Sequence, residues 1–395
     1  MKALRSRVFK SLTCISILFL SFIFGCQGNL NRESTFKRIL EYSNEILVIN
    51  THEHQHEPSE YEIDTLNFFH LLHSTYLMQD LVSAGGKRLE MDEIGTLSLK
   101  EQWDILGTSL DYSRNTSYYG HFIQGFQKLY DFDEMYFTAS NIHELSAQVV
   151  SNYSDFDSWY STAFQKAGFE IMFNDQYWKP FNVDIDTRYF ALVFHVNAIV
   201  YDICKRPEAG GDVLGTYEHA NNDGFEIGSL SDYLDYCAFL FQKNADRNAV
   251  CLKNSMAYGR SLIYQEVSWD EAEQLYAKPA SQLIQHEKTK LEDFMFHWII
   301  EKSIEYNLPI QIHTGYLAGS GNHLENGRPV KLNNLFLKYP DARFVLFHGG
   351  YPWTSEFVAL GKMFPNVYLD PYGFPRSLVK KRCLPWMRCW IVCPT

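Results

Sequence analysis

The sequence predicts an α/β fold in which a parallel β-sheet carries helices on its outside. Two observations predict this class: short apolar runs alternate with helical stretches along most of the 395 residues, and several of these runs end on a polar side chain. Strand, helix and strand repeated in this way are typical of a parallel sheet, either doubly wound or closed into a barrel. The hydrophobic fraction of 46% is sufficient for a large core.

Charge and cysteine usage exclude two classes of protein. The net charge of −12 comes without a basic block, whereas a nucleic-acid surface needs clustered Lys and Arg, so no nucleic-acid partner is expected. Most of the eight cysteines lie near the two ends of the chain, and Cys204, Cys237 and Cys251 remain in its body. An odd number at scattered spacing is not a disulfide framework, so the core must hold the fold together.

Residues 1–26 form a separate segment. Basic residues precede the apolar run "SLTCISILFLSFIFG" and no acidic residue comes before Glu33, which is the pattern of a secretory signal. The run ends in "IFGC", which resembles a bacterial lipobox and would make Cys26 a lipidated N-terminus. We therefore expect an exported protein of the cell envelope, lipid-anchored in the periplasm or at the outer membrane. The alternative is a plain signal peptide or an uncleaved N-terminal anchor.

The body of the chain, residues 27–380, begins with a polar helix expected from Asn29 to about Asn44 and a first buried strand, "EILVIN" (45–50). A long insert follows at about 58–165, where apolar and aromatic side chains recur with helical spacing. Six more strands are predicted at 168–175, 188–196, 248–255, 308–315, 342–350 and 366–373. Helices are predicted between several of them, at 229–243, 269–277, 288–306 and 333–337.

Polar side chains stand where four of the predicted strands end. The first strand leads into His52 and His54, and the fourth contains Lys253. The fifth and sixth end on His313 and His348. All parallel strands of a barrel open their carboxyl ends at one mouth, where such enzymes carry out their chemistry. We therefore expect imidazole and amine groups from four strands to meet there.

The spacing of the histidines favours a divalent metal site. His52 and His54 are two residues apart, so on a strand both project to the same side and can reach one ion. Neutral imidazoles ligate zinc-type ions at about 2.0 Å. A single buried histidine is more often a hydrogen-bonded core residue, but a pair at one strand end with single histidines at two later ends is hard to explain by packing. His56 precedes Pro58, and we expect it on the loop that leaves the site.

Lys253 has two interpretations. It lies inside the apolar run "AVCLKNSM", where an ammonium is costly to bury unless it is paired. In the first interpretation, its stem carries the amine to the mouth of the barrel. In the second, carbon dioxide carboxylates the amine and gives an anionic oxygen ligand that can bridge two metal ions. The spacing does not decide between them.

These residues resemble the amidohydrolase superfamily, in its amidohydrolase-related branch of metal-dependent hydrolases. The matching pieces are "INTHEH", "LKNSMAYGRSL", "PIQIHTG", "FVLFHGGYP" and "NVYLDPYG", which occur in the family's order. The resemblance implies a distorted (β/α)8 TIM-type barrel and one or two divalent ions, with zinc as the expected metal. It implies the following metal ligands: His52, His54, Lys253, His313 and His348.

The resemblance also implies an activity. In that family a water molecule activated by the metal attacks an amide, ester or lactone carbonyl. Lys253 takes the position of the bridging lysine and His348 that of the sixth-strand histidine, so both are catalytic candidates. Hydrolysis of a small polar molecule is the expected function. The alternatives are uronate-isomerase-like or decarboxylase activity on the same barrel, or a metabolite-binding lipoprotein without catalysis. A homo-oligomer is a further expectation.

The end of the sequence departs from the family's pattern. A carboxylate at the end of an eighth strand usually takes the proton of the water, but here the chain runs into "PWMRCWIVCPT". We expect residues 381–395 to be an aberrant tail and the eighth strand to be missing, as a truncation or a shifted reading frame would produce. Asp370 lies on the seventh strand, and the general-base role is not assigned to it.

Other residues near the predicted mouth are candidates for binding the substrate. Tyr258 and Arg260, in "AYGR" after the fourth strand, could bind a substrate carboxylate. Alternatively, they are a stacked loop tyrosine and an arginine paired on the surface. Tyr118, Tyr119 and Phe122 of the insert could roof the pocket, although ordinary packing explains them as well.

Replacing Cys26 with Ser should move the protein from the membrane fraction to the soluble fraction, because the lipobox interpretation makes its thiol the site of lipid attachment. Cell fractionation followed by immunoblotting measures the change. Cys14→Ser removes a thiol from the same apolar segment and should leave the partition unchanged. Unchanged membrane partition of Cys26→Ser would favour an uncleaved anchor instead.

Overall fold

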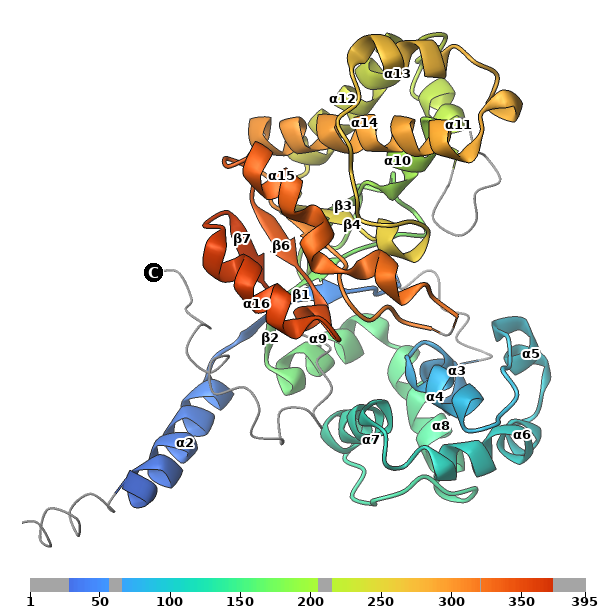
Figure 1. Cartoon of the computed structure of the whole chain (residues 1–395). Coiled ribbons are helices and arrows are strands. Elements are labelled where there is room, and N and C mark those ends of the chain that lie inside the picture. Colours follow the sequence, from blue (N-terminus) through green and yellow to red (C-terminus); the bar gives the residue numbers. More distant parts are fainter. Residues whose placement is uncertain (1–27, 57–65, 205–214, 320, 372–395) are drawn as a thin grey trace, which may run out of the picture. The chain divides into compact units, whose positions relative to one another are not determined.

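The computed structural model describes residues 28–56, 66–204, 215–319 and 321–371 (Figure 1). The signal segment at 1–26, with Cys26, and the tail at 381–395 lie outside the described residues. The expectations about export, lipid anchoring and the eighth strand therefore stay predictions. Among the helices that are described, none combines the length and the hydropathy needed to cross a membrane.

The chain divides into two compact units. The first comprises Met1–Ile49 and Gly168–Glu170, and the second comprises Asn50–Ala167 and Ile171–Thr395. The first unit contains helix α2 (Gly28–Glu45). Within it, the N–H of Val48 donates to the main-chain oxygen of Gly168 at 2.8 Å. All residues predicted for the mouth of the barrel belong to the second unit.

The strands form a seven-stranded sheet in the order of the sequence. They are β1 (Val48–Glu53), β2 (Phe169–Asn174), β3 (Phe190–His195), β4 (Cys251–Asn254), β5 (Ile310–Ile312), β6 (Phe344–Leu346) and β7 (Val367–Leu369). Neighbours from β2 to β7 pair in parallel. The predicted parallel sheet is confirmed, with strands shorter than the apolar runs because the run ends turn into loops.

β1 differs from its prediction in where it ends. The sequence predicts a strand over 45–50, whereas the observed strand continues to Glu53. The main-chain oxygen of Glu53 accepts a hydrogen bond from the N–H of Asp175, just after β2, at 3.0 Å. Pairing thus extends the strand beyond its apolar run, and His52 projects from the strand itself rather than from the following loop.

The sheet curls into a half-barrel. The side chain of Gln311, on β5, is 3% exposed and donates from Nε2 to the main-chain oxygen of Thr51, on β1, at 3.1 Å. These strands are not neighbours in the sheet, so their contact requires the sheet to close around its interior. The arrangement is that of a TIM-type barrel over seven strands, and an eighth strand is not among the described residues.

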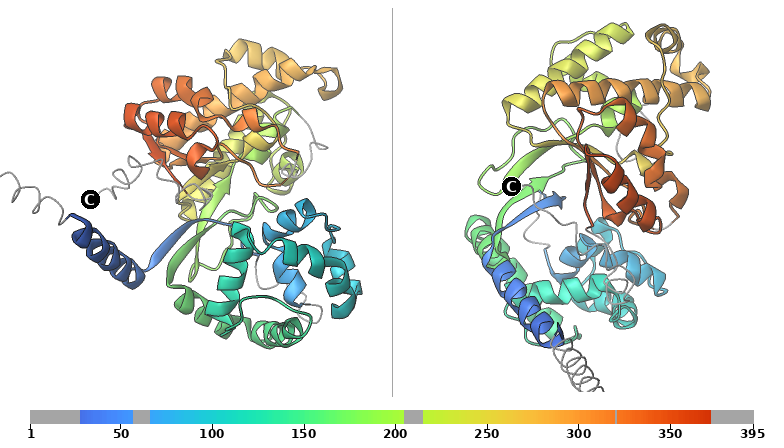
Figure 2. Two further views of the ribbon diagram at one scale, coloured as in Figure 1. Left: turned by 60° about the horizontal axis from the view of Figure 1, so that its bottom comes forward. Right: turned by 60° about the vertical axis from the view of Figure 1, so that its left-hand side comes forward.

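Helices cover the outside of the sheet and explain why its strands are so apolar. β4 and β5 are buried at every position, which is typical of parallel strands covered on both faces. Figures 1 and 2 show helices α10 to α14 gathered beside β3 and β4, and α15 and α16 beside β6 and β7. Phe194 on β3, Leu240 on α12 and Phe296 on α14 share one buried core.

The helices between β3 and β7 are α10 (Asn197–Asp202), α11 (Thr216–Asn222), α12 (Leu230–Asp246), α13 (Trp269–Tyr276), α14 (Gln285–Glu305), α15 (Asn333–Lys338) and α16 (Thr354–Met363), with 3-10 turns η3 (Met256–Tyr258), η4 (Ala280–Gln282), η5 (Leu324–Gly327), η6 (Pro329–Leu332) and η7 (His348–Gly350). Of these, α12 to α15 begin and end close to where the sequence predicts helices, whereas α10, α11 and α16 are not among the predicted helices. α12 begins where it does because Ser229 caps it. The Ser229 hydroxyl accepts from the N–H of Asp232 at 3.2 Å, while the Asp232 carboxylate accepts from the N–H of Ser229 at 2.8 Å.

Helices fill the region between β1 and β2, where the sequence predicts a helical insert. They are α3 (Phe68–His73), α4 (Leu77–Ser83), α5 (Met91–Thr96), α6 (Leu99–Tyr112), α7 (Ser117–Leu129), α8 (Asn141–Tyr153) and α9 (Phe156–Ala167). They enclose a core of their own, which includes Phe68, Leu106, Phe126 and Phe137. The insert is therefore held by its own apolar side chains.

Candidate metal centre

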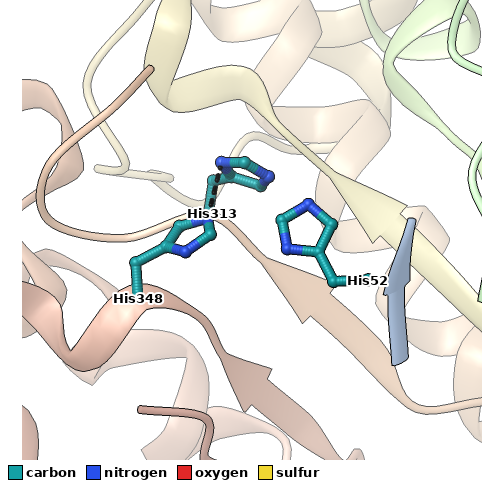
Figure 3. A group of neighbouring side chains, drawn as sticks. All are labelled: His52, His313 and His348. Atoms are coloured by element: carbon teal, nitrogen blue, oxygen red, sulfur yellow. Dashed lines mark hydrogen bonds between the residues drawn. The ribbon is translucent and has the colours of Figure 1, made fainter. Parts of the chain in front are cut away.

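Three histidines from three strand ends meet at the mouth of the half-barrel (Figure 3). His52 lies on β1, His313 directly follows β5, and His348 follows β6 by two residues. One ring nitrogen from each lies within 4.8 Å of the other two, and Nε2 of His348 is 3.3 Å from Nδ1 of His313. This is a group that could hold a metal ion.

Burial keeps these imidazoles in the form that binds metals. His313 is 4% exposed. Burial and the nearby Lys253 hold the pKa of both His313 and His52 well below the usual value. Both rings are therefore neutral at physiological pH, and neutral imidazole is the species that ligates divalent cations.

Main-chain contacts between neighbouring strand ends fix His313 and His348 beside each other. The N–H of Phe347 donates to the oxygen of Ile312 at 2.9 Å, and the hydroxyl of Thr314 donates to the oxygen of Phe347 at 2.6 Å. His348 itself has a φ of 69°, a left-handed conformation that costs a non-glycine residue about 1 to 2 kcal/mol. Strain of this kind concentrates at functional sites.

Gly315 allows the loop that follows β5 to contact the loop that follows β6. Its φ is +69°, and an added Cβ would lie 2.6 Å from both the main-chain carbon of Gly350 and the nitrogen of Tyr351. No other residue type leaves room for this backbone approach. The distance between His313 and His348 therefore depends on a glycine two residues after the first histidine.

His54 lies near the three-histidine group but is not part of it. Its ring centroid is 5.2 Å from that of His52, and its Nδ1 donates to the main-chain oxygen of Asp175 at 2.8 Å. Burial lowers the pKa of His54, an effect that the negative charge of Asp175 opposes. The ring of His56 packs against Trp178 with centroids 4.4 Å apart. Metal ligation by His54 stays a prediction.

Lys253 is completely buried beside the histidines. Its Nζ lies 4.3 Å from the ring centroid of Phe347 and 3.8 Å from Oδ2 of Asp175, and it has no hydrogen-bond partner among the described residues. Burial lowers the pKa of Lys253 to about 8, although Asp175 acts in the opposite direction. The amine does not reach solvent, and it stays mostly protonated near neutral pH, although more of it is uncharged than in an ordinary lysine. The uncharged form is the one that reacts with carbon dioxide.

The sequence reasoning missed Asp175 and His195. Asp175 directly follows β2, and His195 is the last residue of β3. Both residues are 2% exposed, and Oδ1 of Asp175 lies 2.7 Å from Nδ1 of His195. Burial disfavours the charge of Asp175, but His195, His54 and Lys253 together hold the pKa of its carboxyl well below the usual range. The signal was present, because the runs "GFEIMFND" and "RYFALVFHV" also carry polar residues at their ends.

Tyr258 and Arg260 have different surroundings. The ring of Tyr258 lies 5.5 Å from that of His313, and its hydroxyl accepts from the N–H of Ala318 at 3.1 Å. The guanidinium of Arg260 instead contacts Glu292 at 2.9 Å and the carboxylate of Asp293. Tyr258 is thus beside the candidate centre, whereas the charge of Arg260 is already compensated. Their roles toward a substrate stay predictions.

A small pocket lies between the insert and the loop after β5. Its volume is about 180 Å³, and its lining includes Tyr76, Asp80, Tyr118 and Tyr316. Of the aromatic residues considered as a roof, Tyr118 lines this pocket, whereas Tyr119 is buried in the core of the insert. Phe122 packs against the same core.

Comparison with known proteins agrees with this geometry. Residues 283–386 match the family model described as amidohydrolase. This match covers about a quarter of the chain. The matched segment carries His313 and His348, whereas His52, His54 and Lys253 lie before it.

Two solved structures share the fold of this chain. Uronate isomerase from Thermotoga maritima is 13% identical and covers 82% of this chain and 75% of its own, with a TM-score of 0.63. Glucuronate isomerase from Caulobacter crescentus is 15% identical and covers 82% and 73%, with the same TM-score of 0.63. At such identities the likeness shows the fold alone.

A curated relative matches part of the chain. Protein fluG of Emericella nidulans is 28% identical over 190 residues, which are 45% of this chain and 22% of the relative. The matching part of this chain thus spans about a fifth of the length of that relative.

Gly315→Ala should weaken metal binding and lower stability, because the new Cβ would collide with the backbone at 350–351. Forcing the loops apart should cost about 1 to 3 kcal/mol. Zinc titration and urea unfolding measure the two effects. Gly319→Ala is the matched control, since Gly319 has a similar φ of +86° but its Cβ would meet only Asn322, at 3.9 Å. Equal zinc affinity of the two variants would contradict the argument.

Proposed function

We propose that this protein is a metal-dependent hydrolase that acts on an amide, ester or lactone bond of a small polar molecule. The observation that carries this proposal is the convergence of His52, His313 and His348, whose ring nitrogens lie within 4.8 Å of one another. Three imidazoles at a barrel mouth are the donor set of a catalytic divalent ion with open positions.

The described residues fit such an ion. The amine of Lys253 and Oδ2 of Asp175 are buried without a hydrogen-bond partner among the described residues, which leaves polar groups uncompensated beside the three imidazoles. The proposed ligands are His52, His313 and His348, joined by His54. Lys253 lies beside them as the charged amine and would become a further ligand if carbon dioxide carboxylated it. The imidazole donors suit zinc, which we propose as one ion or two. A bound ion would supply a Lewis acid that polarises a carbonyl and acidifies water.

The protein's own groups would orient the substrate and exclude water from it. Phe347 packs against His52 with centroids 4.8 Å apart and covers Lys253, which keeps this part of the mouth apolar. Tyr258 presents its ring to His313 from the opposite loop. A small molecule with one polar reacting group fits these surroundings better than a polymer.

A second candidate is isomerisation of a uronate. It is supported by the likeness of the fold to two uronate isomerases and by the helical insert that follows β1. The same barrel mouth would then polarise a sugar carbonyl instead of adding water to a carbonyl.

The proposal also includes export of the protein with a lipid anchor at Cys26 and its assembly as a homo-oligomer.

Replacing both His52 and His54 with Ala should abolish metal retention with little change in expression, because two imidazole donors on one strand are lost. Elemental analysis of protein purified without chelator measures the metal. Wild type should hold zinc near stoichiometry, and less than about a tenth of an equivalent would refute the site. The control replaces His143 and His286, which are exposed on helices of the same unit, and should keep its metal.

Turnover on matched panels distinguishes the two activities. Hydrolysis of amides, esters or lactones that stops when the ion is chelated and returns when zinc is added would support the proposed function. Interconversion of hexuronates with no hydrolysis would establish the isomerase instead.

Tyr258→Phe should raise KM more than it lowers kcat for either activity, because the Tyr258 hydroxyl holds the loop beside His313 and does not contact a reacting atom.

A further inference from the structure

Asp175 is a buried residue at the end of β2 that contacts groups from three other strands. We propose that Asp175 is the positioning residue of the metal centre: its main chain orients His54, and its carboxylate fixes the amine of Lys253. This inference rests on the proposed metal centre and names the residue that organises it. The residue is 2% exposed and therefore cannot exchange these contacts for water.

The main chain of Asp175 holds β1 at two points. Its N–H donates to the oxygen of Glu53 at 3.0 Å, and its oxygen accepts from Nδ1 of His54 at 2.8 Å. Because a carbonyl oxygen can only accept, the second contact places the proton of His54 on Nδ1 and leaves the lone pair on Nε2. A metal-binding histidine is commonly oriented in this way, by a hydrogen bond from its other nitrogen.

The carboxylate of Asp175 reaches β3 and β4. Oδ1 lies 2.7 Å from Nδ1 of His195, and Oδ2 lies 3.8 Å from Nζ of Lys253 and 3.6 Å from Nδ1 of His54. Oδ2 has no hydrogen-bond partner among the described residues, so its burial depends on the nearby groups of His195, His54 and Lys253 together. The position of the lysine amine and that of the carboxylate are therefore linked.

His195 prevents the carboxylate from turning away. Its Nε2 lies 3.4 Å from the hydroxyl of Ser255, and that hydroxyl accepts from Nδ2 of Asn197 at 2.7 Å. The N–H of Ser255 donates to Oδ1 of Asn197 at 3.0 Å. His195 is also the register partner of Lys253 across β3 and β4. A closed buried network thus holds Asp175 against Lys253.

A merely structural role for Asp175 makes a different prediction. It would lower the stability of the fold when the carboxylate is removed and leave the affinity for metal unchanged. A positioning role must instead change the affinity and the geometry of the bound ion, because the ligands are no longer held in place. Residues that orient metal ligands typically contribute about 10- to 100-fold in metal affinity.

The test compares Asp175→Asn with Asp202→Asn in the full chain. Asn keeps the shape and the main-chain contacts of Asp175 and removes only the charge. Asp202 is the matched control, since it is 1% exposed on α10 and accepts from the N–H of Thr216 at 2.8 Å. The probe is Co²⁺ added to metal-free protein, with affinity and visible absorption spectrum as readouts and thermal unfolding of the metal-free form as the measure of stability.

We expect Asp175→Asn to bind Co²⁺ about 10- to 100-fold more weakly, with an altered spectrum, and Asp202→Asn to lose stability alone. Wild-type affinity and spectrum in Asp175→Asn would overturn the inference. Failure of the wild type to bind Co²⁺ would refute the proposed function instead. If Asp175→Asn does not fold, the affinities of His195→Asn and His195→Leu for Co²⁺ test the inference instead. His195→Asn keeps a hydrogen-bond donor for Oδ1 of Asp175 and should retain the affinity. His195→Leu has no such donor and should lose it. Equal affinity of those two variants would also overturn the inference.

Discussion

The parallel register of β3, β4 and β5 is the constraint on which the rest of the structure depends. His195 pairs with Lys253, and Lys253 pairs with Gln311. Successive residues of a strand point to opposite faces, so a slip of one residue would turn Lys253 toward the covering helices and Leu252 into the interior. Burial of Leu252 in the helix-facing core opposes such a slip. Packing of the helices on the outside of the sheet thus determines which side chains point into its interior.

The same register makes the mouth an electrostatically unusual place. Imidazoles and an amine, all of them bases, lie within a few ångströms of one another, and His313 and Lys253 among them are buried. Burial and mutual repulsion lower the pKa of His52 and His313, so the group avoids accumulating positive charge by remaining neutral. Imidazole nitrogens gathered in one region favour a cation. The arrangement that would be costly as a cluster of charges is therefore suited to hold a metal.

Much of the fold could be predicted because it follows local periodicity. The apolar runs around Lys253 and His313 became β4 and β5, and the helix expected at 229–243 became α12. The end of β1 could not be predicted, since its extension to Glu53 depends on pairing with a segment more than a hundred residues away in the sequence. Local pattern contains no information about such partners.

The candidate site divides in the same way. His52, His313 and His348 could be predicted because a single rule, polar residues at strand ends, places them at one mouth. Applied without exception, that rule would also have found Asp175 and His195. The pairing of Arg260 with Glu292 could not have been found by it, because α14 brings that carboxylate to the loop after β4 only when the helix has packed. Long-range pairing thus makes the residues proposed to bind the substrate harder to predict from the sequence than the residues proposed to bind the metal.

The choice between hydrolysis and isomerisation depends on that substrate side. A barrel fold supports many reactions, and a shared fold at low identity does not select among them. The metal side would be common to both activities, since each needs a polarised carbonyl. The difference must come from what surrounds the carbonyl, and here this is the loop after β5, where Ala318 binds the hydroxyl of Tyr258. Tyr316 on the same loop lines a pocket with Tyr76 and Tyr118 of the insert. The loop that follows His313 therefore joins the candidate centre to the insert.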